Sequence, residues 1–296
     1  MNQTTFFSSP LRKAALFAQT VRLEQTFLAL PFAYLTMFLA EKGVPTLAHF
    51  VWINVAMAGA RTFGMAANRY IDAEIDRTNP RTANRPMPAG LLGRREMLLF
   101  MAAALAVFLI AVYQLSGWTH VLWPVVLAAM TFYPYMKRFT WLCHFGVAAI
   151  YLMVPTGVWI AVTNTLPVGA MLLALAAACW ATGFDIIYQS QDFEYDRLHG
   201  LNSIPARFGP SAALLTARVF HGLAITFVAG AGAALGAGLF YFVGVVAFLA
   251  LVVHEHRLVS PDDLSKANIA FFKMNGIISV TFFVFVAVDV LVRRAA

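Results

Sequence analysis

Two short acidic segments of the chain share the spacing Asp-x-Glu-x-Asp-Arg. The first holds Asp72, Glu74, Asp76 and Arg77 within NRYIDAEIDR, and the second, DFEYDR, repeats the pattern from Asp192 to Arg197. The chain has only 14 acidic residues, and six of them lie in these two segments. This concentration of carboxylates predicts a functional site.

Helical geometry places part of the first segment on one face. If the preceding apolar run continues as a helix, Asn68, Asp72 and Asp76 lie at positions i, i+4 and i+8 of one stripe, with Arg61 two turns before Asn68. Glu74 then points about 200° away from Asp72. We therefore expect Glu74 to stay outside the site.

The same geometry groups Asp185, Tyr188 and Asp192 with Asp196 in the second segment and places Glu194 elsewhere. Two carboxylates one turn apart repel each other unless a cation lies between them. Two such pairs facing each other would form a cage of oxygens, and Mg²⁺ takes oxygen ligands, keeps waters and is completed by substrate phosphates. A single pair at a helix end is as readily explained as solvated charge, but two copies on one membrane face favour a site.

Basic residues in the neighbouring loops suit the same substrate. Arginine matches phosphate oxygens bidentately, and lysine supplies a compact charge. The residues concerned are Arg77, Arg81, Arg85, Lys137, Arg138, Arg197 and Arg207. We expect a magnesium diphosphate to bind at the membrane surface with a hydrocarbon tail among the helices.

The amino-acid composition indicates that the protein lies in a membrane. The chain is 60% hydrophobic and 12% charged, with a mean hydropathy of +0.73, and apolar stretches of about 20 residues, enough to cross a bilayer, recur along it. This predicts an all-α, polytopic membrane protein, a bundle of about nine transmembrane helices around a central cavity, with 1–296 as one domain. The net charge of +7 is explained by basic loops on one side of the membrane, which argues against a nucleic-acid partner.

The predicted spans are separated by loops that sort by charge. Because the loops that carry the acidic segments are rich in Lys and Arg, the positive-inside rule places them and the N-terminus in the cytoplasm. Arg293 and Arg294 break this pattern at the C-terminus, so eight or ten spans remain open. The triplet His254–Glu255–His256 is interpreted as solvated loop in preference to a metal site. The nine predicted spans are 24–41, 47–73, 96–115, 119–136, 142–163, 166–191, 211–231, 236–254 and 270–291.

Three separated motifs resemble the UbiA superfamily of intramembrane aromatic prenyltransferases. They are NRYIDAEID followed by RTANRPMPAG, YPYMKR, and DIIYQSQDFEYDRLHGLNSIPARFG. The resemblance implies a catalytic set of Asp72, Asp76, Asp192, Asp196 and Lys137. It also implies Mg²⁺ bound with the diphosphate by Asn68 and the four aspartates, and substrate binding by Asn68, Tyr133, Arg138, Asp185, Tyr188 and Gln191. The helical stripe and the basic loops described above add Arg61, Arg77 and Arg81 to the predicted substrate-binding residues. By the same resemblance, Tyr133 and Lys137 would contact the diphosphate, and Arg138 would bind the carboxylate of an aromatic acid.

The resemblance also limits the reaction. It implies transfer from a polyprenyl diphosphate to 4-hydroxybenzoate or a related hydroxynaphthoate, in ubiquinone or menaquinone biosynthesis, at the cytoplasmic face of the cytoplasmic (inner) membrane among membrane lipids. Asp185, Tyr188 and Gln191 resemble the hydroxybenzoate branch, whereas Cys143–His144, where that branch has Pro-Gln, resembles the naphthoate branch. Two alternatives stay open: a secondary transporter of an anionic metabolite, and a prenyltransferase of the haem or chlorophyll branch.

Overall fold

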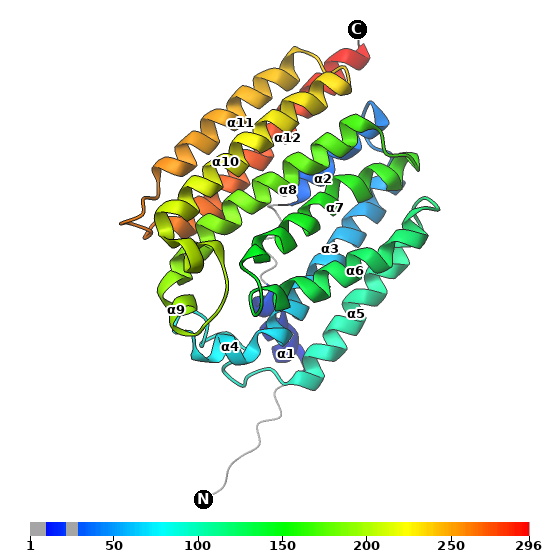
Figure 1. The fold of residues 1–296 in the computed structure, drawn as a ribbon. Helices are drawn as coiled ribbons and strands as arrows, with labels where there is room; N and C mark the ends of the chain where they lie inside the picture. The colour runs from blue at the N-terminus through cyan, green and yellow to red at the C-terminus, as the bar shows by residue number, and fades with distance from the viewer. Residues whose placement is uncertain (1–9, 22–28, 296) are drawn as a thin grey trace, which may run out of the picture.

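The computed structural model describes residues 10–21 and 29–295, and the elements it describes are helices, with one isolated β-bridge between Ser260 and Asp263 (Figure 1). Nine of the described helices correspond in position to the nine predicted spans, although the predicted start at residue 24 lies outside the described residues. Six of the described helices are long and apolar enough to cross a membrane, which confirms the predicted fold class. The nine are α2 (Leu30–Glu41), α3 (Leu47–Ile71), α5 (Arg94–Val112), α6 (Thr119–Met136), α7 (His144–Thr163), α8 (Val168–Gln189), α10 (Ile204–Ala234), α11 (Leu239–Arg257) and α12 (Asn275–Ala295).

Helix α8 is the central element of the bundle. In the span that contains it, 83% of the apolar window is buried, and its alanines allow close packing against α7 and α10. A Cβ on Gly183 of α8 would lie 2.2 Å from the ring of His221 on α10. Small residues of this kind let membrane helices approach closely, so α8 holds the helices on either side of it in fixed positions.

Helix α10 begins earlier than residue 211, where the sequence placed its start. The hydroxyl of Ser203 accepts a hydrogen bond from Ala206 N–H at 3.2 Å and caps the first turn. The helix is then kinked before Pro210, because Gly209 has φ +83°. Since the backbone of Gly209 is not helical, the long second segment of α10 begins at Pro210, which agrees with the predicted start at 211 and suits proline, a favoured first helical residue.

The interpretation of His254–Glu255–His256 as solvated loop was wrong. All three residues lie in the last turn of α11. Glu255 is fully buried and accepts a hydrogen bond from the Asn275 side chain at 3.0 Å, while His254 alone is exposed. Because α11 continues to residue 257, this turn still packs against α12.

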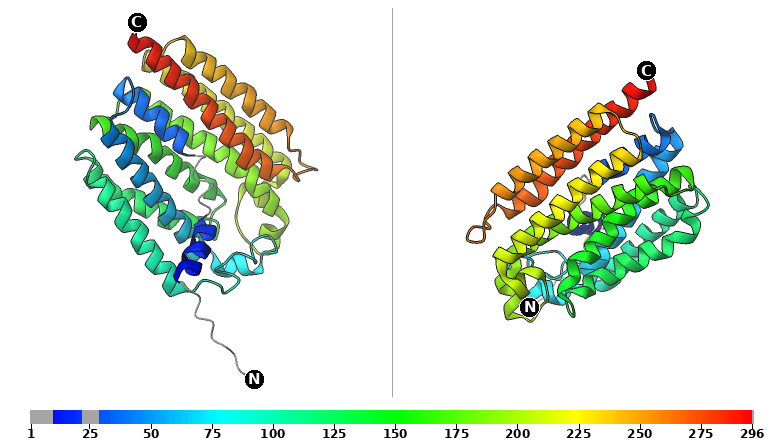
Figure 2. Two further views of the ribbon diagram at one scale, coloured as in Figure 1. Left: turned by 180° about the vertical axis from the view of Figure 1, so that it is seen from behind. Right: turned by 45° about the horizontal axis from the view of Figure 1, so that its top comes forward.

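The two acidic segments have the same local backbone. Helix α3 ends at Ile71, Asp72 has φ −91° and ψ 4°, and the short helix α4 (Ala73–Thr78) follows. After α8 and a 3-10 turn (Ser190–Asp192), Asp192 has φ −94° and ψ 7° and precedes α9 (Phe193–Leu198). Both short helices lie at the same end of the bundle, near the remaining short helix α1 (Pro10–Val21) (Figures 1 and 2). The sequence repeat is thus also a structural repeat.

Candidate active site

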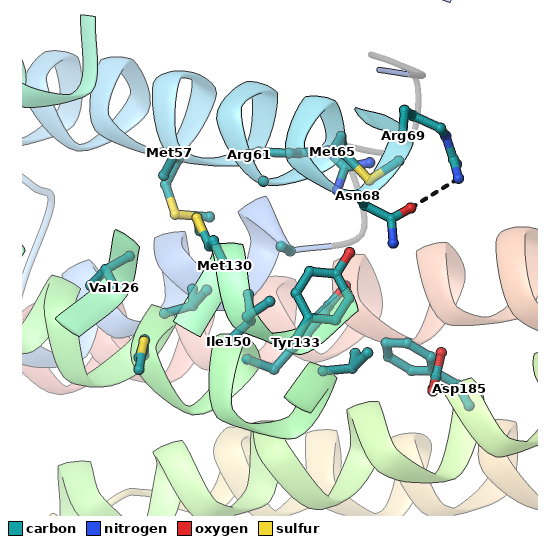
Figure 3. Close-up of a pocket in the computed structure, with 18 of the residues that line it drawn as sticks. Met57, Arg61, Met65, Asn68, Arg69, Val126, Met130, Tyr133, Ile150 and Asp185 are labelled. Atoms are coloured by element: carbon teal, nitrogen blue, oxygen red, sulfur yellow. Dashed lines mark hydrogen bonds between the residues drawn. The ribbon is translucent and has the colours of Figure 1, made fainter. Parts of the chain in front are cut away.

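A cavity of about 390 Å³ opens between α3, α6, α7 and α8. Its charged end lies beside α4 and α9, and its inner part is apolar and aromatic. Figure 3 shows Tyr133 of α6 pointing across the cavity toward α3, where Met65 and Asn68 line the opposite wall. The polar lining residues are Arg61, Asn68, Arg69, Asp72, Asp76, Asn79, Arg81, Arg85, Thr119, Tyr133, Lys137, Tyr151, Asp185, Tyr188, Gln189, Asp192, Tyr195 and Asp196.

Asp72 is buried at the end of α3 and has two basic partners. Its carboxylate lies 2.7 Å from Lys137 Nζ and 3.3 Å from Arg138 Nη2, and the Asn68 side chain donates to it at 3.3 Å. The backbone bond from Asp72 N–H to Asn68 C=O, at 2.9 Å, continues the helical pattern through the bend. Asn68 and Asp72 therefore remain on one face, as the spacing predicts.

Asp76 follows one turn later and is also buried. Arg85 Nη1 donates to it at 2.7 Å, and Arg69 Nη1 lies 3.9 Å away. Arg69 also donates to Asn68 Oδ1 at 3.0 Å (Figure 3). The prediction did not include Arg69, although its position seven residues before Asp76 places both on one helical face.

Asp192 in the second segment is held by an arginine from the first. Arg81 donates from Nε and Nη2 to the two carboxylate oxygens at 2.8 and 2.5 Å, and from Nη1 to the Tyr188 hydroxyl at 3.0 Å. Burial lowers the pKa of Arg81, but its hydrogen bond to Asp192 and the nearby negative charge outweigh this, so the net pKa is raised. Arg81 therefore stays charged.

Asp196 is the one aspartate of the four that forms no ion pair with a described residue. It is 6% exposed and accepts a hydrogen bond from Ser203 Oγ at 3.3 Å. Nearby, the Tyr195 hydroxyl donates to the Ile75 carbonyl at 3.0 Å and contacts the Thr78 hydroxyl at 2.6 Å. These contacts join α9 to α4, so the two acidic segments form one end of the cavity.

Asp185 lies deeper in the cavity than Asp192. Its Oδ2 is 2.7 Å from Nδ1 of His144, which is fully buried at the start of α7. Arg61 of α3 and Tyr133 line the same region, and Phe184 and Tyr151 pack edge to face with ring centroids 5.3 Å apart. The carboxylate of Asp185 and the imidazole of His144 thus lie side by side next to an aromatic part of the cavity wall.

Three predicted substrate-binding residues are not among the residues that line the cavity. Arg77 follows Asp76 by one position and so turns outward, where it is mostly exposed and pairs with exposed Glu74 at 3.3 Å. Gln191 turns away in the same manner and donates to the Tyr188 carbonyl, whereas Gln189 lines the cavity. Arg138 reaches Asp72 from outside the cavity and donates to the Ile71 carbonyl at 2.6 Å. The expectation that Glu74 stays outside agrees with this structure.

The donor atoms of the site fit a hard divalent cation. The four aspartates and Asn68 offer oxygen atoms, which Mg²⁺ prefers, and Mg²⁺ usually keeps waters and is bound by one or two carboxylates with substrate phosphates. Within residues 10–21 and 29–295 no three His, Cys, Asp or Glu side chains lie close enough together to hold a metal by themselves. The arrangement suits an ion that is shared between protein and substrate oxygens.

Comparisons with known proteins identify the family of the chain. The sequence profile described as the UbiA prenyltransferase family matches residues 29–277. A 4-hydroxybenzoate octaprenyltransferase of Cupriavidus metallidurans is 31% identical over 273 residues, which cover 88% of this chain and 89% of the relative. A similar enzyme of Pseudoalteromonas translucida is 28% identical over 262 residues, with 88% of each chain covered.

Solved structures share the fold. The apo structure of a UbiA homolog from Aeropyrum pernix has 30% identity and a TM-score of 0.78, and it covers 92% of this chain and 99% of its own. A UbiA homolog from Archaeoglobus fulgidus, bound to GPP and Mg²⁺, has 19% identity and a TM-score of 0.72, with 93% and 99% coverage. At 19% identity, the similarity to the second structure is a similarity of fold alone.

Proposed function

The chain belongs to the UbiA prenyltransferase family, and from this premise we propose that it transfers a polyprenyl group from a polyprenyl diphosphate to a hydroxylated aromatic acid in quinone biosynthesis, with Mg²⁺ as cofactor. The observation that carries the proposal is the charged end of the cavity, where four aspartates and their basic partners adjoin an apolar interior. A transporter site is expected near the middle of the membrane, whereas these charges lie at one end of the bundle.

Basic side chains supply the diphosphate site. Lys137, Arg81 and Arg85 each pair with a different aspartate, so three positive charges converge on the same end of the cavity. On binding, phosphate oxygens would replace carboxylates as partners of these cations. Arginine and lysine bind phosphate in complementary ways, as a bidentate fork and as a point charge.

The three carboxylates released in this way, together with Asp196 and Asn68, would hold Mg²⁺. The residues concerned are Asn68, Asp72, Asp76, Asp192 and Asp196. When bound, the ion neutralises the charge of the diphosphate and makes it a better leaving group. The partner exchange also leaves Asp72, Asp76 and Asp192 with a cation in both states, which offsets the repulsion between carboxylates at one end of the cavity.

The inner part of the cavity suits the tail and the acceptor. Apolar side chains such as Met57, Val126 and Met130 line it, and the prenyl tail would lie along them. Arg61, within the cavity, is better placed than Arg138 to bind the carboxylate of the acceptor. Aromatic faces stabilise nearby positive charge, so Tyr151 and Phe184 would stabilise the allylic cation.

Bond changes follow from these positions. The allylic C–O bond breaks and leaves its electron pair on the diphosphate, where Lys137, Arg81 and Arg85 stabilise the charge. An electron-rich ring carbon of the acceptor then bonds to the prenyl carbon, and the ring loses its proton to a base. The apolar walls keep water away from the cation.

The acceptor is 4-hydroxybenzoate or a hydroxynaphthoate, and we propose that it binds on the cytoplasmic side of the inner membrane. The names of the relatives favour 4-hydroxybenzoate. Purified protein is incubated with a labelled polyprenyl diphosphate, Mg²⁺ and either 4-hydroxybenzoate or 1,4-dihydroxy-6-naphthoate. We expect a lipid-soluble product with one acceptor, lost on chelation and restored by Mg²⁺. No product with either acceptor, while diphosphate still binds, would overturn the proposal.

A further inference from the structure

The position of Asp185 and its contact with His144 are not needed to bind the diphosphate. It lies on α8 seven residues before Asp192, about 10 Å deeper at the helical rise per residue. This separation leaves room for the reacting prenyl carbon and an aromatic ring between the two carboxylates. Asp185 is 8% exposed, and the exposed part faces the cavity.

The two oxygens of Asp185 have different surroundings. Oδ2 is 2.7 Å from His144 Nδ1, whereas Oδ1 receives no hydrogen bond from any described residue. A carboxylate oxygen in a largely apolar wall is costly to leave without a partner. A ligand that donates a hydrogen bond to Oδ1 would remove that cost.

A backbone contact fixes how His144 meets Asp185. The Ile204 N–H, at the start of α10, donates to His144 Nε2 at 3.2 Å. Since Nε2 accepts, the ring hydrogen of neutral His144 lies on Nδ1 and is donated to Asp185, because the bond at one imidazole nitrogen decides the tautomer. His144 is fully buried, so its orientation is set by three helices: α7, α8 and α10.

We propose that His144 is a positioning residue that holds Asp185 as the hydrogen-bond acceptor for the ring hydroxyl of the aromatic substrate. This inference rests on the proposed function. A hydroxyl that donates to an anionic oxygen releases electron density into the ring, which favours attack by the ring carbon. A methyl ether at the same place has no hydrogen to donate, so the pair selects hydroxylated acceptors.

The position of Arg61 supports this assignment, because Arg61 could bind the other end of the aromatic substrate. Arg61 lines the cavity, and both Arg61 and Asp185 are close enough to act electrostatically on Tyr133 and on Tyr151. A hydroxybenzoate carries an anion at one end and a hydroxyl donor at the other. One cation and one anion on the walls of one cavity match these two ends.

The test compares His144→Ala, His144→Gln and Asp185→Asn with the unchanged protein, using full-length chain in lipid nanodiscs. Glutamine keeps a donor for Asp185 and an acceptor for Ile204 N–H, so it is the conservative variant. His49→Ala, at the other end of the bundle, is the matched control. The readouts are KM for 4-hydroxybenzoate, KM for the prenyl diphosphate, and the inhibition constant of 4-methoxybenzoate.

We expect His144→Ala and Asp185→Asn to raise KM for 4-hydroxybenzoate about ten- to a hundredfold, the worth of one hydrogen bond to a charged group. KM for the diphosphate and inhibition by 4-methoxybenzoate should stay within about twofold of the unchanged protein, because neither involves the lost hydrogen bond. His144→Gln should restore most of the preference for the hydroxyl. If 1,4-dihydroxy-6-naphthoate is the acceptor that gives product, its methyl ethers replace 4-methoxybenzoate.

A purely structural role predicts a different pattern. Equal losses for both substrates and for the methoxy inhibitor would overturn the inference, as would an unchanged hydroxyl preference in His144→Ala. If His144→Ala does not fold, His144→Gln and Asp185→Asn decide by the same ratios. Failure of the unchanged protein to form product with either acceptor refutes the proposed function instead, so the two failures are distinct.

Discussion

Replacing Arg81 by lysine tests whether the fork on Asp192 has a role in diphosphate binding. Lysine keeps the charge of Arg81 but presents one ammonium in place of a planar fork. Arg81 donates two hydrogen bonds to Asp192, at 2.8 and 2.5 Å, and one to Tyr188 at 3.0 Å. A lysine at this place can keep one of the three.

The size of the effect follows from the bonds that phosphate oxygens would take over from Asp192 when the diphosphate binds. A hydrogen bond to a charged group contributes about 1.5–3 kcal/mol. Because the Arg81 side chain is 33% exposed, solvent screening reduces the loss of two such bonds to about 1–2 kcal/mol in all. A loss of this size corresponds to a decrease of about 5- to 30-fold in kcat/KM for the prenyl diphosphate.

Arg77→Lys is the matched control in the same assay, with labelled polyprenyl diphosphate, saturating acceptor and Mg²⁺. Arg77 lies outside the cavity and pairs with exposed Glu74, so its kcat/KM should remain within about twofold of the unchanged protein. Unchanged activity of Arg81→Lys, or an equal loss in Arg77→Lys, would refute the assignment of the two arginines.

Two further predictions concern packing and helical position. Gly146→Ala places a Cβ 2.7 Å from that of Tyr133, so we expect about 1–3 kcal/mol of destabilisation, seen as a lower thermal unfolding temperature and slower transfer. Gly222→Ala is the control: its Cβ meets nothing within 4 Å, so the unfolding temperature and the transfer rate should stay unchanged. Equal effects of the two substitutions would contradict the packing argument. Gln189→Ala should raise KM for the prenyl diphosphate or for the aromatic acceptor in steady-state assays, because Gln189 lines the cavity, whereas Gln191→Ala should raise neither KM. A larger effect of Gln191→Ala than of Gln189→Ala would show that the placement of these residues is wrong.

Local spacing predicted the parts of the site that depend on one helix. The i, i+4, i+8 rule placed Asn68, Asp72 and Asp76 on one face, and the backbone bonds across the bend keep them there. The rule also separated Glu74 from them. The same rule, applied to Asp185, points to Gln189 and not Gln191, so that error came from matching a motif without checking helical position. Arg77 was included because it lies among the basic residues near the site, again without a check of its helical position.

Contacts between distant segments were beyond local spacing. Arg81 follows α4 in a loop, so no periodicity connects it with Asp192. The His144–Asp185 pair joins the start of α7 to the end of α8, and its bond to Ile204 depends on where α10 begins. The predicted start at 211 matches the segment after Gly209, but the short helical segment that begins at Ile204 was not predicted. These pairs arise from tertiary packing, which the order of residues does not display.

The proposed reaction depends most directly on the aspartates as ligands of magnesium diphosphate. Asp72→Asn and Asp192→Asn remove a charge with little change of shape, and Glu74→Gln does the same at an exposed acid. The decisive measurement is Mg²⁺-dependent binding of labelled polyprenyl diphosphate, and its transfer, by each folded variant. We predict that both aspartate variants lose binding and transfer while Glu74→Gln keeps them. Binding and transfer retained in both aspartate variants would contradict the account.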